Sequence, residues 1–142
     1  MQTSEQDGIL FVRLFPGEDV PACLSDACRK HAIVSGALVC GIGMLRGIEL
    51  GYFDRSAGRY ESHSFPEPME LVSMNGNIAR DGDGIMVHAH AALAGRDGRM
   101  VGGHLSRATV EVTAEIVIVR STVPASRKIE GEAGLKGLFL DE

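Results

Sequence analysis

The chain has 142 residues and a formal net charge of −5 at pH 7, with 44% hydrophobic and 23% charged residues. These proportions are those of a globular protein, so a disordered or collagen-like chain is excluded, and the length fits one domain with at most a tail. Its 14 Lys and Arg residues against 19 Asp and Glu residues leave no basic surplus for holding phosphates. Nucleic acid is therefore disfavoured as a partner.

The N-terminus and the cysteines indicate the compartment. The first ten residues are polar and lack the charged start and apolar run of a signal peptide. No apolar run approaches the ~18 residues of a membrane span. Cys23, Cys28 and Cys40 form no CxxC pair, so we interpret them as small buried side chains rather than a disulfide framework or a thiolate metal site. We expect a cytoplasmic protein without a membrane partner.

The first elements are one strand and one helix. Residues 9–16 are an apolar run that ends at Pro16-Gly17, which predicts a buried strand. Pro21 suits a first helical turn, and Arg29 and Lys30 suit a last one. The side chains between these positions that recur at helical spacing are Val20, Cys23, Leu24, Ala27, Cys28 and His31. This pattern predicts the one principal helix, with His31 at its end.

From residue 35 onward, short apolar runs alternate with Gly, Pro, Asn or Asp. The runs are residues 36–43, 45–54, 58–65, 69–78, 85–93, 100–112 and 114–119. This spacing predicts an α+β fold, a mostly antiparallel sheet or sandwich of about seven strands with the helix packed on it.

The composition changes near the C-terminus. We place the domain at residues 1–124 and a C-terminal segment at residues 125–142. We expect residues 126–134 to form a mobile, charged link, and the apolar residues 135–142 to dock on the same or a neighbouring subunit.

Residues 87–107 contain a hairpin signal with histidines on both sides. Asp97-Gly98 favours a tight turn. His88 and His90 are two residues apart on the first strand, so their side chains project from the same face. With a two-residue turn at Asp97-Gly98, His104 falls on the opposite face.

Two other hairpin geometries bring His104 to the face of the other two histidines. A β-bulge at Gly102-Gly103 shifts every later residue to the other face, and a three-residue turn over residues 96–98 has the same effect. Two of the three geometries therefore group the imidazoles.

Three convergent neutral imidazoles with an open fourth position are the ligand set of catalytic zinc centres. Imidazole also suits Cu, Fe and Ni, and zinc is the default. We predict that His88, His90 and His104 bind a divalent transition metal. The alternative is that they are ordinary hydrogen-bonding strand residues. His31 and His63 have no such partners.

Other polar positions carry weaker signals. Asn75-Gly76 predicts a structural turn or bulge. Glu115 stands in an apolar run, where an unpaired carboxylate is costly. One hypothesis is that it pairs with an Arg. The other is that it orients a metal-bound water as a general base, which makes it our single candidate catalytic residue. We favour pairing, and Glu70 poses the same question. Residues 41–43 read GxG without a third glycine, which disfavours a dinucleotide site.

Motifs along almost the whole chain carry a family resemblance. They are residues 16–20 (PGEDV), 41–43 (GIG), 69–78 (MELVSMNGNI), 88–90 (HAH), 97–98 (DG), 102–105 (GGHL) and 113–118 (TAEIVI). In order and spacing they resemble the PPC domain, the plant and prokaryote conserved domain. The resemblance implies a β-rich fold with one principal helix that assembles as a homotrimer. It also implies that HxH and GGH bind metal, which carries over to His88, His90 and His104.

The resemblance leaves the activity open. Plant members join this domain to an AT-hook that reads the DNA minor groove, and they replace the histidines. This sequence has no Arg-Gly-Arg-Pro hook, which argues against the DNA-binding label often attached to the family. A more distant likeness is to acetolactate decarboxylase, which is similar in fold and in an HxH plus a later His that hold zinc; this likeness is an analogy.

These observations favour a metal-binding homotrimer with a three-histidine site and an undetermined activity. One alternative is a metal-dependent lyase or hydrolase that acts on a small oxygen-rich substrate. Another is a DNA-binding or regulatory protein. Whether the protein is an enzyme, and which small molecule binds at the metal, stay open at this point.

Overall fold

The computed structural model describes residues 1–131 and 134–140, in which it has nine strands and one helix. The strands are β1 (Gln2–Gln6), β2 (Ile9–Leu14), β3 (Gly36–Asp54), β4 (Arg59–Phe65), β5 (Met69–Asp81), β6 (Gly84–Ala94), β7 (Met100–Arg120), β8 (Ala125–Glu130) and β9 (Leu135–Leu140). The helix is α1 (Val20–Lys30). The predicted α+β class, mostly strand with one helix, is confirmed.

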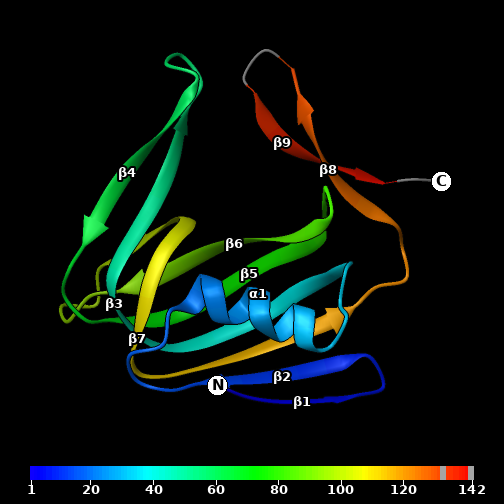
Figure 1. Cartoon of the computed structure of the whole chain (residues 1–142). Coiled ribbons are helices and arrows are strands. Elements are labelled where there is room, and N and C mark those ends of the chain that lie inside the picture. The colour runs from blue at the N-terminus through cyan, green and yellow to red at the C-terminus, as the bar shows by residue number, and fades with distance from the viewer. Residues whose placement is uncertain (132–133, 141–142) are drawn as a thin grey trace.

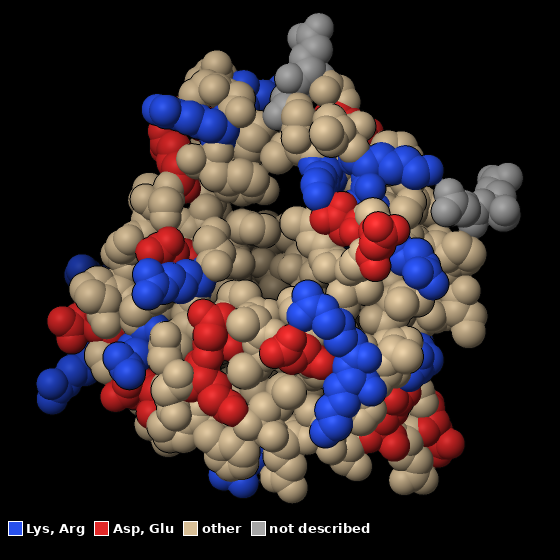
Figure 2. All heavy atoms as spheres, in the orientation of Figure 1, with Lys and Arg blue, Asp and Glu red and all other residues tan. Residues whose placement is uncertain are grey.

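One sheet joins all the strands. Its order is β1-β2-β7-β3-β5-β8-β9, with β4 paired to β3, and β6 paired to both β5 and β7. The pairings are antiparallel except for a single parallel bridge between Arg80 of β5 and Ser126 of β8. The β3–β4 hairpin and the β8–β9 hairpin rise on opposite sides of β5 and β6 (Figure 1). The space-filling view is hollowed between these two arms (Figure 2).

Helix α1 begins and ends as its sequence predicts. Asp19 caps it by accepting a hydrogen bond from the backbone N–H of Ala22 at 2.8 Å, and His31 is the C-cap residue. The helix contacts β7, β6 and β2 and buries Val20, Leu24, Ala27 and Cys28. It therefore covers one face of the sheet. It has 11 residues, and no helix in the described part of the chain is long and apolar enough to cross a membrane.

Two pairs of predicted runs form single long strands. Residues 36–43 and 45–54 are both in β3, which has 19 residues, and residues 100–112 and 114–119 are both in β7, which has 21. The pairing of β3 with β7 shifts register beside Gly43 and again between Arg46 and Glu49. The glycine and polar interruptions are thus β-bulges, which bend a strand without ending it.

The two ends of the chain differ from the prediction. The polar N-terminus forms β1, which pairs with β2 across a turn at Asp7-Gly8, where both φ angles are positive. Strand β2 alternates exposed and buried residues, so it is half-buried rather than buried. Residues 126–131 and 134–140 form most of the β8–β9 hairpin rather than a link, while residues 132–133 and 141–142 lie outside the described residues. Docking on a neighbouring subunit stays a prediction.

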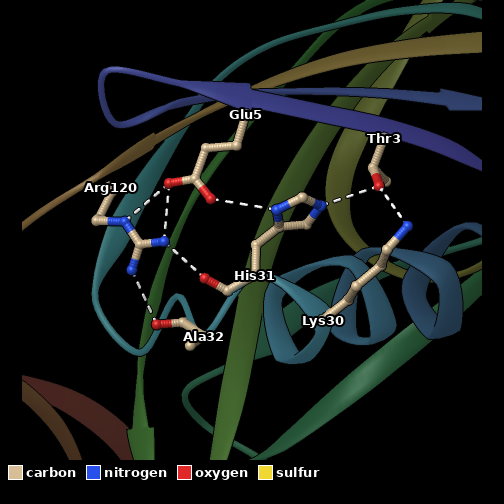
Figure 3. A network of polar contacts seen from close by, with 6 residues as sticks. All are labelled: Thr3, Glu5, Lys30, His31, Ala32 and Arg120. Atoms are coloured by element: carbon tan, nitrogen blue, oxygen red, sulfur yellow. Dashed lines mark hydrogen bonds and ion pairs between the residues drawn. The ribbon is translucent and has the colours of Figure 1, made fainter.

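A polar network joins the end of α1 to the edge of the sheet (Figure 3). The carboxylate of Glu5 accepts hydrogen bonds from Arg120 Nε at 3.0 Å and Nη2 at 2.8 Å, and it lies 3.2 Å from His31 Nδ1. Arg120 also donates to the backbone oxygens of His31 and Ala32 at 2.6 and 2.9 Å. The hydrogen bond from Arg120 lowers the pKa of the Glu5 carboxyl. His31 is therefore a structural residue at the helix end, as predicted.

The three cysteines are free, as predicted, but differ in burial. Cys28 lies on the buried side of α1 and belongs to the core, and Cys23 is half-buried. Cys40 is exposed on β3. The expectation that all three are buried is wrong for Cys40, because its side chain points away from the face that α1 covers.

Candidate metal centre

The side chains of His88, His90 and His104 lie together on the sheet face opposite α1. Ala89 and Ala91, which alternate with the first two histidines along β6, are buried in the core. His90 is paired directly with His104 of β7. One ring nitrogen from each histidine lies within 4.8 Å of the other two, and the ring centroids are 5.0 to 5.6 Å apart. The predicted convergence of the three imidazoles is confirmed.

A three-residue turn over residues 96–98 sets this register. The N–H of Gly95 donates to the carbonyl of Arg99 at 2.9 Å, and the N–H of Gly98 donates back to Gly95 at 2.8 Å. From this turn to the histidines, β6 and β7 pair without a shift. The alternative bulge at Gly102-Gly103 is therefore wrong, since both glycines pair regularly with β6.

Asn75-Gly76 is likewise neither a turn nor a bulge. Both residues lie inside β5 and pair regularly with His90 and Ala89 of β6. A Cβ on Gly76 would lie 2.0 Å from the carbonyl oxygen of His88. This glycine is required because β5 and β6 approach too closely beside the site for any side chain at that position.

Three neighbours of the histidines come from other strands. The ring of Tyr60 on β4 lies with its centroid 5.1 Å from that of His104. Asn77 of β5 is paired with His88, and its side-chain oxygen accepts a hydrogen bond from Arg127 of β8. The sequence reasoning missed all three, because no local pattern connects them to the histidines and because Arg127 lies in the segment that was interpreted as a link.

The surroundings favour the neutral form of His88 and His104. Burial, followed by the charges of His104, Arg127 and His90, lowers the pKa of His88 to about 4. Burial also lowers the pKa of His104. Metal binding needs the neutral imidazole with a free lone pair, so these shifts prepare the two side chains as ligands.

The donor set fits a transition metal. Nδ1 of His104 is buried and has no hydrogen-bond partner in the described part of the chain, and a buried polar atom without a partner is costly. Three nitrogen donors from two adjacent strands, with no carboxylate in the group that the described residues form, suit zinc and its neighbours in the first transition row. Coordination through Nδ1 would satisfy the unpartnered nitrogen.

The lowered pKa of His88 predicts an acid-sensitive metal-free protein. Between its unfolded pKa of about 6.5 and its folded pKa of about 4, this histidine is protonated in the unfolded chain before it is protonated in the folded one. Its contribution to the free energy of unfolding is therefore complete above pH 6.5 and is lost as the pH falls towards 4. We expect urea unfolding of chelator-treated protein to show that the free energy of unfolding falls more steeply with decreasing pH for the wild type than for His88→Gln. Equal slopes would contradict the assignment.

The two glutamates of the prediction lie outside the group. Glu115 follows His104 by eleven residues on β7. In the register of the sheet its backbone lies opposite Arg13 of β2 and Ile42 of β3, and its side chain is exposed. It is not in a buried environment, because the strand alternates and places it on the solvent side. The structure thus does not bring it to the histidines as a general base. Glu70 and His63 are exposed and also lie outside the group.

Comparison with known proteins identifies the family. The sequence pattern of the Plants and Prokaryotes Conserved (PCC) domain matches residues 1–122. The chain belongs to this family. A protein of known structure that is named for the same domain superposes along almost the whole chain.

The solved structures similar to this chain include two relatives, from Pyrococcus horikoshii and Archaeoglobus fulgidus, that are at least 25% identical. A plant- and prokaryote-conserved (PPC) protein from Pyrococcus horikoshii is 26% identical, with a TM-score of 0.83, over 99% of this chain and 94% of that one. A metal-containing protein from Archaeoglobus fulgidus is 25% identical, with a TM-score of 0.84, over 97% of this chain and 95% of that one. A Bacteroides thetaiotaomicron protein, provisionally named as DNA-binding, has a TM-score of 0.91 at 23% identity over 97% of this chain and 96% of that one. This last likeness shows the fold alone.

The curated relatives are much longer proteins. Bifunctional proteins GlmU from two Synechococcus strains are 32% and 31% identical over 111 residues, which are 78% of this chain. The chain matches only 17% and 16% of their lengths. It therefore spans about a sixth of each of these relatives, and their activities are not assigned to it.

Proposed function

We propose that this protein of the PCC family binds one divalent transition metal ion per chain through His88, His90 and His104, with zinc favoured. The observation that carries the proposal is the grouping of the three imidazoles around one point on the outer face of the sheet. The Archaeoglobus fulgidus relative, which is named as metal-containing, supports it. When bound, such an ion supplies Lewis-acid chemistry at a coordination position that the protein leaves open.

The neighbouring residues have roles in this proposal that follow from their contacts. Tyr60 covers the ring of His104 and limits the access of water from the β4 side. Gly51, which is paired with His104, leaves room for the ring of Tyr60, since a Cβ there would lie 2.9 Å from Tyr60 Cδ1. Gly76 permits the approach of β5 that holds the backbone of His88 in place.

Metal analysis tests the proposal directly. Inductively coupled plasma mass spectrometry of protein purified without an affinity tag or chelator should find about one transition metal ion per chain, and it also identifies the ion. A chelator should remove the ion, and added zinc should restore it. Protein that stays metal-free after incubation with zinc, cobalt and nickel would overturn the proposal.

We further propose that the chain assembles as a homotrimer, as the family resemblance implies. The outer face of β2, β3 and β7 has a groove of about 490 Å³ lined by Phe11, Cys40, Ile42 and Val117 among others. Phe11 is 61% exposed and Ile42 is 47% exposed. Contiguous apolar surface of this kind is rare on a monomer and marks an interface, so these residues support contact between copies of the chain.

Light scattering tests the assembly. Multi-angle light scattering at micromolar concentration should return three times the chain mass of 15.1 kDa, about 45 kDa. Phe11→Glu should lower this mass by placing a charge in the proposed interface, whereas Tyr52→Glu, at the similarly exposed Tyr52 on the β3–β4 arm, should leave it unchanged. A wild-type mass of one chain would overturn the proposal.

DNA binding is not part of the proposed function. The names that mention DNA belong to structures 23% and 22% identical to this chain, which shows a shared fold. Lys and Arg side chains are interspersed with Asp and Glu over the face in Figure 2, with no continuous basic surface, and the net charge is −5. A metal-dependent lyase or hydrolase stays a prediction.

A further inference from the structure

Arg127 is a buried cation beside the histidines. Its residue exposure is only 8%, although arginine is almost never fully buried without an anionic partner. Nη2 donates to the side-chain oxygen of Asn77, and Nη1 lies 3.4 Å from the backbone oxygen of Lys136. Nε is buried and has no hydrogen-bond partner in the described part of the chain. The guanidinium therefore has unused donor capacity in a sheltered position.

No carboxylate among the described residues neutralises this guanidinium. The carboxylate of Asp81, whose charge acts on Arg127, is held by Lys136, whose Nζ lies 2.8 and 2.6 Å from its two oxygens. Both oxygens that Arg127 contacts belong to neutral groups. Burial lowers the pKa of Arg127, although the charge of Asp81 acts in the opposite direction. A buried charge without a counter-charge is expensive unless a ligand supplies one.

The position of Arg127 connects it to the metal centre. Its acceptor Asn77 is paired with His88 across β5 and β6, so the two side chains lie on the same face of the sheet. A metal held by three neutral imidazoles would carry its full positive charge near the guanidinium. An anion between these two positive charges would stabilise both.

We infer that the site binds the carboxylate group of a small-molecule ligand, with one oxygen at the open coordination position and the other hydrogen-bonded to Arg127. The inference rests on the proposed metal site and specifies the class of ligand that it takes. A carboxylate matches because its two oxygens satisfy the planar fork of a guanidinium and a metal simultaneously. The N–H of Nε and one N–H on each of Nη1 and Nη2 are the donors left for it.

The C-terminal hairpin is suited to admit such a ligand. Arg127 lies on β8, beyond the residues 1–122 that match the family. Strand β8 has a single β-bridge to β5, between Ser126 and Arg80, besides the side-chain contact of Arg127 with Asn77. The hairpin stands beside the hollow above β5 and β6 (Figures 1 and 2).

A cobalt-substituted protein provides the test, because the visible bands of Co²⁺ respond to a change in its ligands. Wild-type protein with Co²⁺ bound is titrated with acetate, and Arg127→Gln is titrated in parallel. Loss of a charge-assisted hydrogen bond should weaken acetate binding about tenfold to a hundredfold. Arg127→Lys keeps the positive charge but lacks the planar guanidinium, so its acetate affinity should lie between those of the wild type and Arg127→Gln. Imidazole, a neutral ligand, should bind wild type and Arg127→Gln equally.

The outcomes separate this inference from the metal proposal. Failure to bind Co²⁺ would count against the metal site itself. Metal binding with equal acetate affinity in wild type and Arg127→Gln would overturn the role of Arg127. Tighter binding of inorganic phosphate than of acetate by the wild type would overturn the carboxylate assignment. If Arg127→Gln does not fold, the wild type decides alone, because acetate that binds no more tightly than the neutral acetamide would contradict the inference.

The control variant is Arg80→Gln, at the exposed Arg80 beside β8, which should bind acetate as the wild type does.

Discussion

His90→Ala is expected to remove most of the bound metal while the chain stays folded. His90 lies directly opposite His104 and next to His88 on the same face, so its loss leaves two ligands. The affinity for zinc should fall by more than the ~10–100-fold that the loss of an outer-shell partner costs. The side chain of His90 is exposed, so its removal leaves no cavity in the core. Metal analysis and a zinc titration against a chromophoric chelator measure the effect.

The matched control for this prediction is His63→Ala. His63 is an exposed strand histidine on β4, opposite Leu50, and lies outside the group of three. The His63→Ala variant should retain the metal content of the wild type. Circular dichroism should give both variants, without metal, the thermal midpoint of the metal-free wild type. Equal metal content in wild type and His90→Ala would show that these histidines are ordinary strand residues.

Gly76→Ala is expected to have the largest effect on stability. The added Cβ would lie 2.0 Å from the carbonyl oxygen of His88 and 2.9 Å from Cα of Ala89. Both contacts are with backbone atoms, which cannot rotate away, so β5 and β6 must separate beside the metal centre. Forcing atoms into a packed region costs about 1–3 kcal/mol or more. Because His88 moves with its backbone, zinc affinity should also fall. Urea unfolding and zinc titration measure the two effects.

Gly84→Ala tests whether the cost comes from this close approach. Gly84 begins β6 in the same hairpin, and the nearest atom to its added Cβ is the carbonyl oxygen of Asp81, at 3.6 Å. That is ordinary van der Waals contact, so the free energy of unfolding should change by about 0.5 kcal/mol or less. If Gly76→Ala were as stable as Gly84→Ala, β5 and β6 would not pair as described.

The sequence was sufficient to place the three histidines on one face, but it was not sufficient to choose the turn that sets their register. The same-face placement of His88 and His90 depends only on the period of two along a strand. The position of His104 depends on the turn, and the sequence allowed two geometries that gave the same parity. The choice of a three-residue turn without a bulge is made by the backbone hydrogen bonds between Gly95 and Arg99 and by the long pairing that continues from them.

The sequence by itself determined the local features of this protein. The cap at Asp19 and the spacing of apolar residues determine α1, and strand periodicity determines the common face of the first two histidines. Tertiary structure alone decided that β3 continues as one long strand past the register shift that follows Gly43, because its pairing with β7 resumes on the other side of the shift. It also decided that Tyr60 and Arg127 flank the site. These contacts join strands far apart in the chain, and the energy that holds them comes from pairing and burial across the sheet, which no local pattern encodes.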